Sequence, residues 1–271
     1  MVLREMQTRN YSQRSIDTYI HLLRDLEEYF KCSIDELSID QVKDFLQYSI
    51  TERNLSVSYI NQVISAVKIL QKDILGKDWE SIQIKRPRRI KKLPVVLSKE
   101  AVKSMIETKR NLKHRTMLAV IYSASLRISE LISLRPADID SDRKQIRVLG
   151  KGNKHRYTLL SQNTLDMLRM YWRAYKPVRY LFEGQKQGQP VSQSTIQQVF
   201  RRACKKTGIS KPASVHSLRH SFATHLLESG VNLKIIQSLL GHSSLRTTSI
   251  YLHVTRFDPS SIKSPFDEID F

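Results

Sequence analysis

The sequence has few cysteines, the residues that cross-link small secreted domains and bind zinc in metal-binding domains. Cysteine occurs twice, at Cys32 and Cys204, which is too few for a disulfide framework and lacks the Cys/His spacing of a zinc site. Residues 1–9 lack the apolar core of a signal peptide, and no stretch approaches the roughly 18 apolar residues of a membrane span. We therefore expect a soluble, cytoplasmic protein without a metal site, a cofactor or a membrane partner.

Acidic residues are also scarce relative to basic ones. The 271 residues include 45 Lys and Arg against 26 Asp and Glu, a formal net charge of +19, while 40% of the chain is hydrophobic. The basic residues are interleaved with apolar helical patterns along the chain, so we expect folded basic surfaces rather than a disordered tail. Such surfaces favour a polyanionic partner, and the length is comfortable for two domains.

The first part of the chain is predicted to be entirely helical. Between Ser12 and Gly76, apolar residues recur at helical spacing and predict three or four helices. The segment Ser38-Ile-Asp-Gln41 resembles a capping box ahead of one of them. We assign residues 1–80 to a small helical bundle that clamps a partner and carries no candidate catalytic residue.

A run of cations follows this bundle. Six of the eight residues from Lys85 to Lys92 are Lys or Arg, and Pro87 and Pro94 disfavour a helix. A solvated charge run is the alternative, but an extended basic strap between two domains is well placed to follow a phosphate backbone. We therefore assign residues 81–97 to a linker whose DNA-contacting residues are Lys85, Arg86, Arg88, Arg89, Lys91 and Lys92.

Residues 98–271 are predicted to form a second, mainly helical domain with one exception. Residues 145–148 and 155–160 flank a glycine-containing turn at 150–154, which is typical of a β-hairpin. Helices are expected over residues 164–175 and 194–206. The fold class is thus mainly α with a small β-hairpin or sheet.

A guanidinium is expected at an unusual place in this second domain. Apolar residues on both sides of Arg127 predict a helix lined by Leu118, Ile121, Ile128 and Leu131. Arg127 falls at the break between the two apolar stretches, which is an odd position for an arginine unless it points into a pocket. The alternative is an interdomain ion pair with Glu130.

Two polar side chains are expected on the same side of a later helix, in its first turn. His216 and Arg219 are three residues apart, so they project from one side of the first turn of a helix that Gly230 stops. Taken alone, a histidine at a helix start is more often a cap or a surface residue. Two residues that come later in the chain support a functional role for this pair.

Those two side chains are expected to converge with this pair. His242 lies in the turn after a helix that Asn232 caps and Gly241 ends, and Tyr251 lies in a final short helix. Between Ile250 and Leu252, this tyrosine alone is more typical of a core residue than of a nucleophile.

These pieces together resemble a known family. The sequence contains, in order, Leu126-Arg127-Ile-Ser-Glu130-Leu131, Gly150-Lys151-Gly-Asn-Lys154, His216-Ser-Leu-Arg219-His220, Leu240-Gly241-His242, and Tyr251 nine residues later. This order is similar to the active-site motifs of the tyrosine recombinases, the phage-integrase family, particularly its Xer-like members. The helical N-terminal region and the linker also resemble that family's SAM-like core-binding domain and interdomain connection.

One residue departs from the family pattern. Ser125 stands where many members have glycine before Leu-Arg. A position that needs positive φ would tolerate serine poorly. We expect the backbone at Ser125 to be helical or extended.

The resemblance implies DNA cleavage and rejoining through a 3′-phosphotyrosyl link, without a high-energy cofactor. Tyr251 would be the nucleophile, Arg127 and Arg219 would stabilise the nonbridging oxygens, and His216 would accept the tyrosine proton. Lys151 would protonate the leaving 5′-oxygen, with Lys154 as the alternative and otherwise a contact to the DNA backbone. His242 would donate a hydrogen bond to the phosphate, and Glu130 would orient the helix that follows Arg127.

The implied partner is double-stranded DNA, bound by a homotetramer in the synaptic complex, with a monomer or weak oligomer in the absence of DNA. The apolar segment after Tyr251 is expected to dock on a neighbouring protomer, the alternative being its own domain. Three other functions compete: a type IB topoisomerase with the same constellation, a non-catalytic DNA-binding protein on this fold, and, least favoured, a metal-dependent nuclease.

Overall fold

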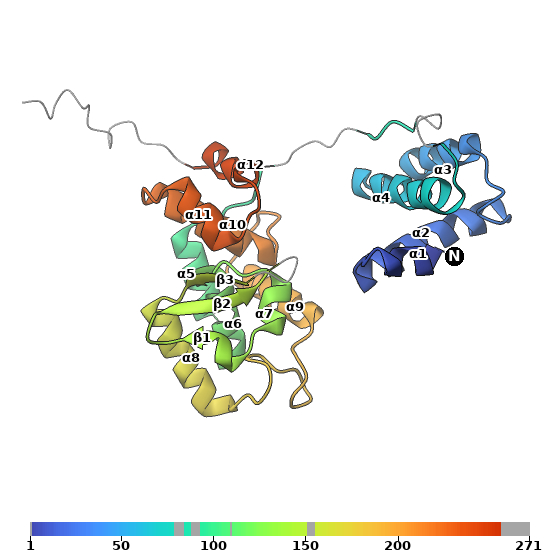
Figure 1. Cartoon of the computed structure of the whole chain (residues 1–271). Helices are drawn as coiled ribbons and strands as arrows, with labels where there is room; N and C mark the ends of the chain where they lie inside the picture. The colour runs from blue at the N-terminus through green and yellow to red at the C-terminus, as the bar shows by residue number, and fades with distance from the viewer. Residues whose placement is uncertain (1, 79–83, 88–92, 109, 151–154, 256–271) are drawn as a thin grey trace, which may run out of the picture. The chain divides into compact units, whose positions relative to one another are not determined.

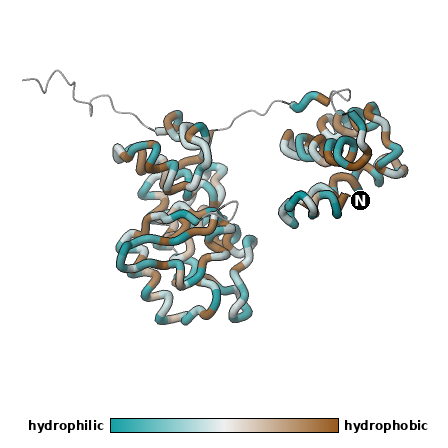
Figure 2. Tube along the Cα trace, viewed as in Figure 1, coloured by the Kyte–Doolittle hydropathy of each residue, from teal (hydrophilic) through white to brown (hydrophobic). Residues whose placement is uncertain are grey.

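The computed structural model describes residues 2–78, 84–87, 93–108, 110–150 and 155–255 (Figure 1). The chain divides into two compact units, Met1–Lys91 and Lys92–Phe271. Among the described residues, no helix is long and apolar enough to cross a membrane. Each unit has its own buried core, and hydrophobic and hydrophilic segments alternate along the helices of both (Figure 2).

The N-terminal unit is helical, as the apolar spacing predicts. Its elements are α1 (Val2–Thr8), α2 (Gln13–Phe30), α3 (Ile39–Thr51), α4 (Val57–Lys68) and the π-helical η1 (Ile69–Ile74). The capping box at α3 is confirmed: Gln41 N donates to Ser38 Oγ (3.1 Å), and Ser38 N donates to Gln41 Oε1 (2.9 Å). Sequence periodicity missed α1, a short helix whose Met6 is buried against Ile16 and Ile69.

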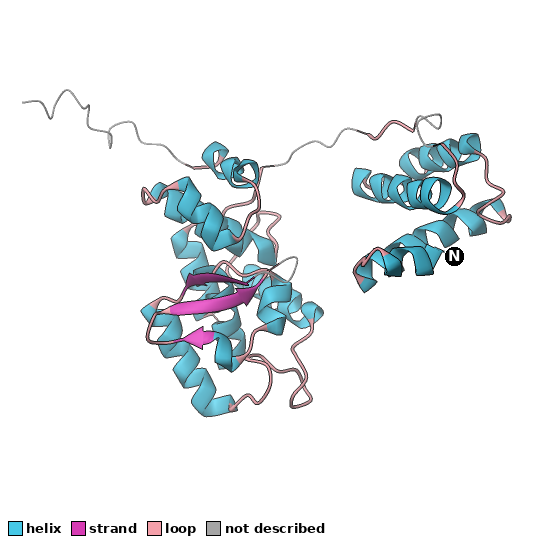
Figure 3. Cartoon of the chain, in the orientation of Figure 1, coloured by secondary structure: helices cyan, strands magenta, loops and turns pink. Residues whose placement is uncertain are grey.

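The second unit is mainly helical around a small sheet (Figure 3). Its helices are α5 (Lys99–Glu107), α6 (Leu112–Ser123), α7 (Ile128–Ser133), η2 (Pro136–Asp138), α8 (Gln162–Tyr175), α9 (Gln193–Lys206), α10 (Val215–Glu228), α11 (Leu233–Leu240), α12 (Leu245–Thr248) and η3 (Ser249–His253). The strands β1 (Ile139–Asp140), β2 (Gln145–Leu149) and β3 (His155–Leu159) form an antiparallel sheet in the order β1-β2-β3. The predicted mainly helical fold class is therefore confirmed.

The predicted hairpin is β2 and β3, paired from Gln145 opposite Leu159 to Leu149 opposite His155. Ile146 and Val148 are buried while Leu149 is exposed, so the alternation along β2 places one face on the core. The hairpin turn at residues 151–154, and with it Lys151 and Lys154, lies outside the described residues. The two-residue strand β1 was too short to show a pattern of its own.

The single helix expected through Arg127 is wrong. Helix α6 ends at Ser123 and α7 begins at Ile128, with Arg127 in extended conformation immediately before α7. The end of α6 is a Schellman motif, because Leu126 N donates to Ile121 O (3.1 Å) and Ser125 N donates to Tyr122 O (3.2 Å).

This helix end also corrects the expectation for Ser125. Its φ is 53°, so the residue is left-handed, neither helical nor extended. Glycine is the usual residue at this position of the motif because a Cβ is unfavourable there. Ser125 is fully buried and its Oγ has no hydrogen-bond partner in the described structure.

Candidate active site

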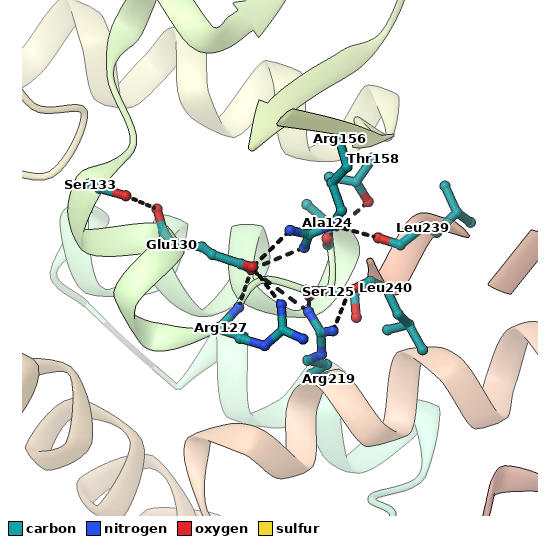
Figure 4. A network of polar contacts seen from close by, with 10 residues as sticks. All are labelled: Ala124, Ser125, Arg127, Glu130, Ser133, Arg156, Thr158, Arg219, Leu239 and Leu240. Atoms are coloured by element: carbon teal, nitrogen blue, oxygen red, sulfur yellow. Dashed lines mark hydrogen bonds and ion pairs between the residues drawn. The ribbon is translucent and has the colours of Figure 1, made fainter. Parts of the chain in front are cut away.

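The break between α6 and α7 places Arg127 beside Glu130. The Glu130 carboxylate accepts hydrogen bonds from the Arg127 backbone N and from Arg127 Nη1, both at 2.7 Å (Figure 4). The backbone bond satisfies a free amide at the start of α7, and the side-chain bond turns the guanidinium toward the carboxylate. The ion pair that the alternative expected is therefore present, but it is not interdomain, because both residues belong to the second unit.

Arg219 enters the same cluster from α10. Its side chain is 1% exposed, Nη1 donates to Ser125 O (2.6 Å), and Nη2 donates to Leu240 O (2.5 Å). Its Nη1 also lies 3.7 Å from Glu130 Oε2. Arg219 therefore joins the end of α6, the end of α11 and the carboxylate on α7, as Figure 4 shows.

Arg156, on β3, completes the cluster and was missed from the sequence. It donates to both carboxylate oxygens of Glu130 (2.7 and 3.0 Å) and, through Nε, to Leu239 O (2.9 Å). Such a bidentate pair fixes both partners in one plane. Arg156 thus holds the hairpin against α7 and against the end of α11.

The chain beyond α11 is shaped around Arg156. Gly241 has a φ of 63°, and a Cβ at this position would lie 2.7 Å from Arg156 Cδ. Glycine is therefore needed both for the left-handed turn and for the close approach of the arginine. The turn sets the position of His242, whose carbonyl accepts from Gln237 Nε2 (2.9 Å).

The cluster carries an excess of positive charge. Burial alone would raise the pKa of Glu130, but the hydrogen bonds and charges of Arg156 and Arg127 outweigh it and lower that pKa. Burial lowers the pKa of Arg219 to about 10, with a further contribution from Arg127, so it stays protonated at neutral pH. One carboxylate thus faces three guanidinium groups, which leaves a site suited to an anion.

Arg127 is the member of the cluster that is open to a ligand. Its side chain is 34% exposed, against 10% for Arg156 and 4% for Glu130. Arg219 lies deeper and holds two backbone carbonyls. An anion would therefore meet Arg127 first, with the charge of Arg219 behind it.

The hydroxyl of Tyr251 reaches the same region from η3. Tyr251 is 1% exposed, packs with Ala223, Ile236 and Leu240, and its hydroxyl lies 3.0 Å from His220 Nδ1. Burial raises the pKa of Tyr251, while the charges of Arg219 and Arg127 oppose that rise. The ring of Tyr251 is part of the core, as the alternative in the sequence analysis expected. Its hydroxyl nevertheless points at a histidine.

His216 and His242 lie within the field of the same arginines. Loss of hydration lowers the pKa of the exposed His216, and Arg219 and Arg127 lower it further. Burial lowers the pKa of His242 to about 4, again with Arg219 and Arg127 contributing, and its Nδ1 lies 3.0 Å from Thr248 Oγ1. Both imidazoles are therefore neutral at pH 7.

The structure thus brings together five of the six residues predicted to be catalytic. They are Arg127, His216, Arg219, His242 and Tyr251, drawn from the start of α7, α10, the turn after α11, and η3. The sixth, Lys151, lies outside the described residues, as do the predicted DNA contacts Arg88, Arg89, Lys91, Lys92 and Lys154.

Of the two predicted DNA contacts that the structure describes, Lys85 is exposed and Arg86 is engaged with its own unit. The Arg86 guanidinium donates to Asn61 O (2.9 Å) and to Ser65 Oγ (3.0 Å), both on α4. These contacts fasten the start of the basic segment to the helical bundle.

Two residues around the site had no assigned role at the level of sequence. His220 is the last residue of the motif that begins at His216, one helical turn earlier. Arg156 lies two residues after Lys154, and no local pattern marks it. Among the described residues, no group of three or more His, Cys, Asp or Glu could hold a metal ion.

Comparison with known families now decides the class of protein. The Phage integrase family matches residues 95–256, and the Phage integrase N-terminal SAM-like domain matches residues 1–81. The chain belongs to the phage integrase family. It is a tyrosine recombinase, an enzyme that cleaves and rejoins DNA in site-specific recombination.

Individual relatives agree with this assignment. A tyrosine recombinase of Thermosipho africanus (strain TCF52B) is 34% identical over 258 residues, 91% of this chain and 90% of the relative. An integrase/recombinase of Escherichia coli is 31% identical over 304 residues, covering 96% and 90%. The crystal structure of the XerH site-specific recombinase bound to a palindromic difH substrate has a TM-score of 0.73 and 25% identity, covering 93% of this chain and 80% of that one.

Proposed function

We propose that this recombinase cleaves DNA by forming a covalent 3′-phosphotyrosyl link at Tyr251. The observation that supports this most is the convergence of a buried tyrosine hydroxyl with the cationic cluster of Arg127 and Arg219. Cleavage and rejoining without a high-energy cofactor requires the energy of the phosphodiester to be kept in a covalent link. A phosphate ester of tyrosine keeps it.

The two arginines bind the scissile phosphate in this proposal. Charge develops on the nonbridging oxygens as the tyrosine oxygen attacks phosphorus, and guanidinium forks stabilise such oxygens in a fixed geometry. Arg127 is exposed enough to bind directly, while Glu130 and Arg156 hold it and Arg219 in place. Neutral His242 donates a hydrogen bond to the same phosphate.

Protons must move on both sides of the phosphorus atom. As the bond from Tyr251 to phosphorus forms, the bond from phosphorus to the 5′-oxygen breaks, and that oxygen needs a proton. Lys151 supplies it in our proposal, and Lys154 contacts the DNA backbone. The tyrosine hydroxyl must lose its own proton, and the family resemblance implies His216 as the acceptor. The geometry around Tyr251 favours His220 instead.

The remaining assignments concern DNA binding and assembly. Residues 1–80 and the second unit clamp double-stranded DNA, and the linker at residues 81–97 follows its phosphates through Lys85, Arg88, Arg89, Lys91 and Lys92. Arg86 anchors this linker to α4. Strand exchange takes place in a homotetramer on DNA.

The segment after Thr255, which lies outside the described residues, contributes to this tetramer by docking on a neighbouring protomer. It contains five large apolar residues, namely Phe257, Ile262, Phe266, Ile269 and Phe271. Removal of residues 261–271 should weaken assembly on paired sites more than binding to a single site. A loss of thermal stability with unchanged assembly would instead place the segment on its own domain.

A plasmid assay tests the function as a whole. A supercoiled plasmid that carries two copies of a candidate recombination site is incubated with the protein in the presence of EDTA. We expect recombined circles. Relaxed circles alone would indicate a topoisomerase, unchanged plasmid would indicate a DNA-binding protein without this activity, and linear product only when EDTA is replaced by Mg²⁺ would indicate a nuclease.

A further inference from the structure

The hydroxyl of Tyr251 has a defined partner in the protein. His220 Nδ1 lies 3.0 Å from it, within hydrogen-bond distance, and the two ring centroids are 5.8 Å apart. His216, one turn earlier on α10, lies edge-on to His220 with ring centroids 4.8 Å apart. Among the described residues, His216 makes no hydrogen bond to Tyr251. The histidine that touches the proposed nucleophile is therefore His220.

The surroundings of His220 keep its ring neutral. Burial lowers the pKa of His220 to about 4, and the neighbouring His216 and Arg219 contribute further. A neutral imidazole has one nitrogen that donates and one that accepts. Tyr251 is also neutral, since burial raises its pKa. If Nδ1 is the accepting nitrogen, the tyrosine hydroxyl donates to it and its proton already points along the path of transfer.

We propose that His220 Nδ1 accepts the proton of Tyr251 when the tyrosine attacks phosphorus. The step rests on the function proposed above. The bond from Tyr251 Oη to phosphorus forms, the bond from Oη to hydrogen breaks, and that hydrogen moves to His220 Nδ1. The bond from phosphorus to the 5′-oxygen breaks with its electron pair on the oxygen, which takes a proton from a separate donor.

Bound DNA makes His220 a better base than it is in the free protein. Arg219 lowers the basicity of His220 by its positive charge. A phosphate held by Arg127 and Arg219 adds negative charge at that point and offsets the repulsion. In the rejoining step the direction reverses: a 5′-hydroxyl attacks phosphorus, the tyrosine oxygen leaves, and protonated His220 returns the proton to it.

The first test compares His220→Asn with a matched change, His216→Asn. Asparagine keeps a polar side chain at the position but has no basic nitrogen, so it removes proton acceptance more than packing. The substrate is a nicked suicide duplex carrying one candidate recombination site, and the measured quantity is the single-turnover rate of adduct formation at saturating DNA. We expect His220→Asn to slow adduct formation about 100-fold or more, with DNA affinity unchanged. His216→Asn should have the smaller effect.

A second substrate separates the two proton transfers. A bridging sulfur in place of the 5′-oxygen gives a leaving group that departs without protonation. The His220→Asn loss should therefore be the same on the sulfur and oxygen substrates, whereas the loss in Lys151→Ala should be restored by sulfur. Three results would overturn the proposal: a His220→Asn rate within about threefold of wild type, a faster rate, or rescue of His220→Asn by sulfur.

A measurement on the unaltered protein covers the case in which His220→Asn fails to fold. Histidine labelled with ¹⁵N reports by NMR which ring nitrogen carries the proton. We expect His220 Nδ1 to be unprotonated in the free protein at pH 7, and a protonated Nδ1 would contradict its role as acceptor. The proposed function, in contrast, fails if wild-type protein forms no adduct or forms it at a residue other than Tyr251, and none of the results that would overturn the role of His220 has that effect.

Discussion

The N-terminal bundle and the rest of the chain differ sharply in charge. Residues 1–80 contain ten Lys and Arg against thirteen Asp and Glu, whereas residues 81–271 contain 35 against 13. Basic residues do occur among the apolar patterns of both regions, but their excess over acidic residues is confined to residues 81–271. The bundle is slightly acidic, and the excess of cations begins with the linker.

This difference separates two ways of holding DNA. We expect the linker and the second unit to bring cations to the phosphates and so to supply most of the salt-dependent affinity. We expect the bundle, being slightly acidic, to contribute mainly by its shape and by a few local contacts. The second unit also contains the proposed active site, because its cationic cluster and Tyr251 lie together there.

The largest expected effect comes from Tyr251→Phe. The change removes one oxygen and keeps the ring among its core neighbours, so folding and DNA affinity should survive. Covalent trapping of a nicked suicide substrate should be lost completely, because no other group supplies the attacking oxygen. If this variant still formed an adduct that resists denaturation, Tyr251 would not be the nucleophile.

The next effect is that of Arg127→Ala. Loss of one charge-stabilising group typically costs about 100- to 1,000-fold, and we expect the adduct-forming rate at saturating DNA to fall by that factor. The matched control is Arg147→Ala, which removes a 47% exposed guanidinium paired with Asp138. Such a surface pair contributes at most about 1 kcal/mol, so the control should cleave normally. Equal rates in the two variants would contradict the assigned role of Arg127.

The salt dependence of binding sharpens the contrast between bundle and linker. Changing Arg86, Arg88, Arg89 and Lys91 together to Gln should flatten the plot of log affinity against log salt, by about 0.9 for each phosphate that is no longer neutralised. Arg86→Gln alone should leave the slope nearly unchanged and instead lower the stability of the bundle, because Arg86 bonds to α4. An unchanged slope in the fourfold variant would show that the linker does not touch DNA.

Acid should weaken the second unit through its neutral histidines. The pKa values of His220 and His242 are lowered to about 4 in the folded protein, against about 6.5 in an unfolded chain. The unfolded state therefore binds more protons between these values, so the free energy of unfolding falls as pH drops from about 6.5 toward 4. Calorimetry should show a falling melting temperature across this window, with a shallower fall in His242→Asn. A flat profile would contradict the neutral, partly buried state of these rings.

The smallest expected effect is a gain. Ser125→Gly should raise the free energy of unfolding by about 1 kcal/mol, because glycine adopts the left-handed conformation freely and removes a buried hydroxyl without a partner. Ser125→Ala is the control that removes the hydroxyl and keeps the Cβ. Urea denaturation measures both, and a Ser125→Gly protein less stable than wild type would show that serine is not strained there.

Sequence patterns predicted the parts of this molecule that are encoded locally. The capping box at Ser38, the helix that opens near His216 and the turn at Gly241 depend on residues within one or two turns of each other, so spacing reveals them. Ordered motifs also brought Arg127, Arg219 and Tyr251 into one predicted site.

Patterns failed where tertiary contacts decide. Arg156 is defined by bonds to Glu130 and to Leu239, which lie 26 and 83 residues away, and no local signal marks such a residue. Ser125 was misjudged because the apolar residues continue across the break, whereas the backbone hydrogen bonds at the end of α6 require a left-handed residue there. His220 was overlooked because its partner, Tyr251, is 31 residues away.

The central claim is that Tyr251, a residue of the second unit, attacks the DNA. Its most direct test is to trap wild-type protein on a nicked suicide duplex, digest the adduct and identify the modified peptide by mass spectrometry. We predict a nucleotide attached to the peptide that contains Tyr251. Attachment to another tyrosine, such as Tyr122 or Tyr157, or to any other residue would contradict the account.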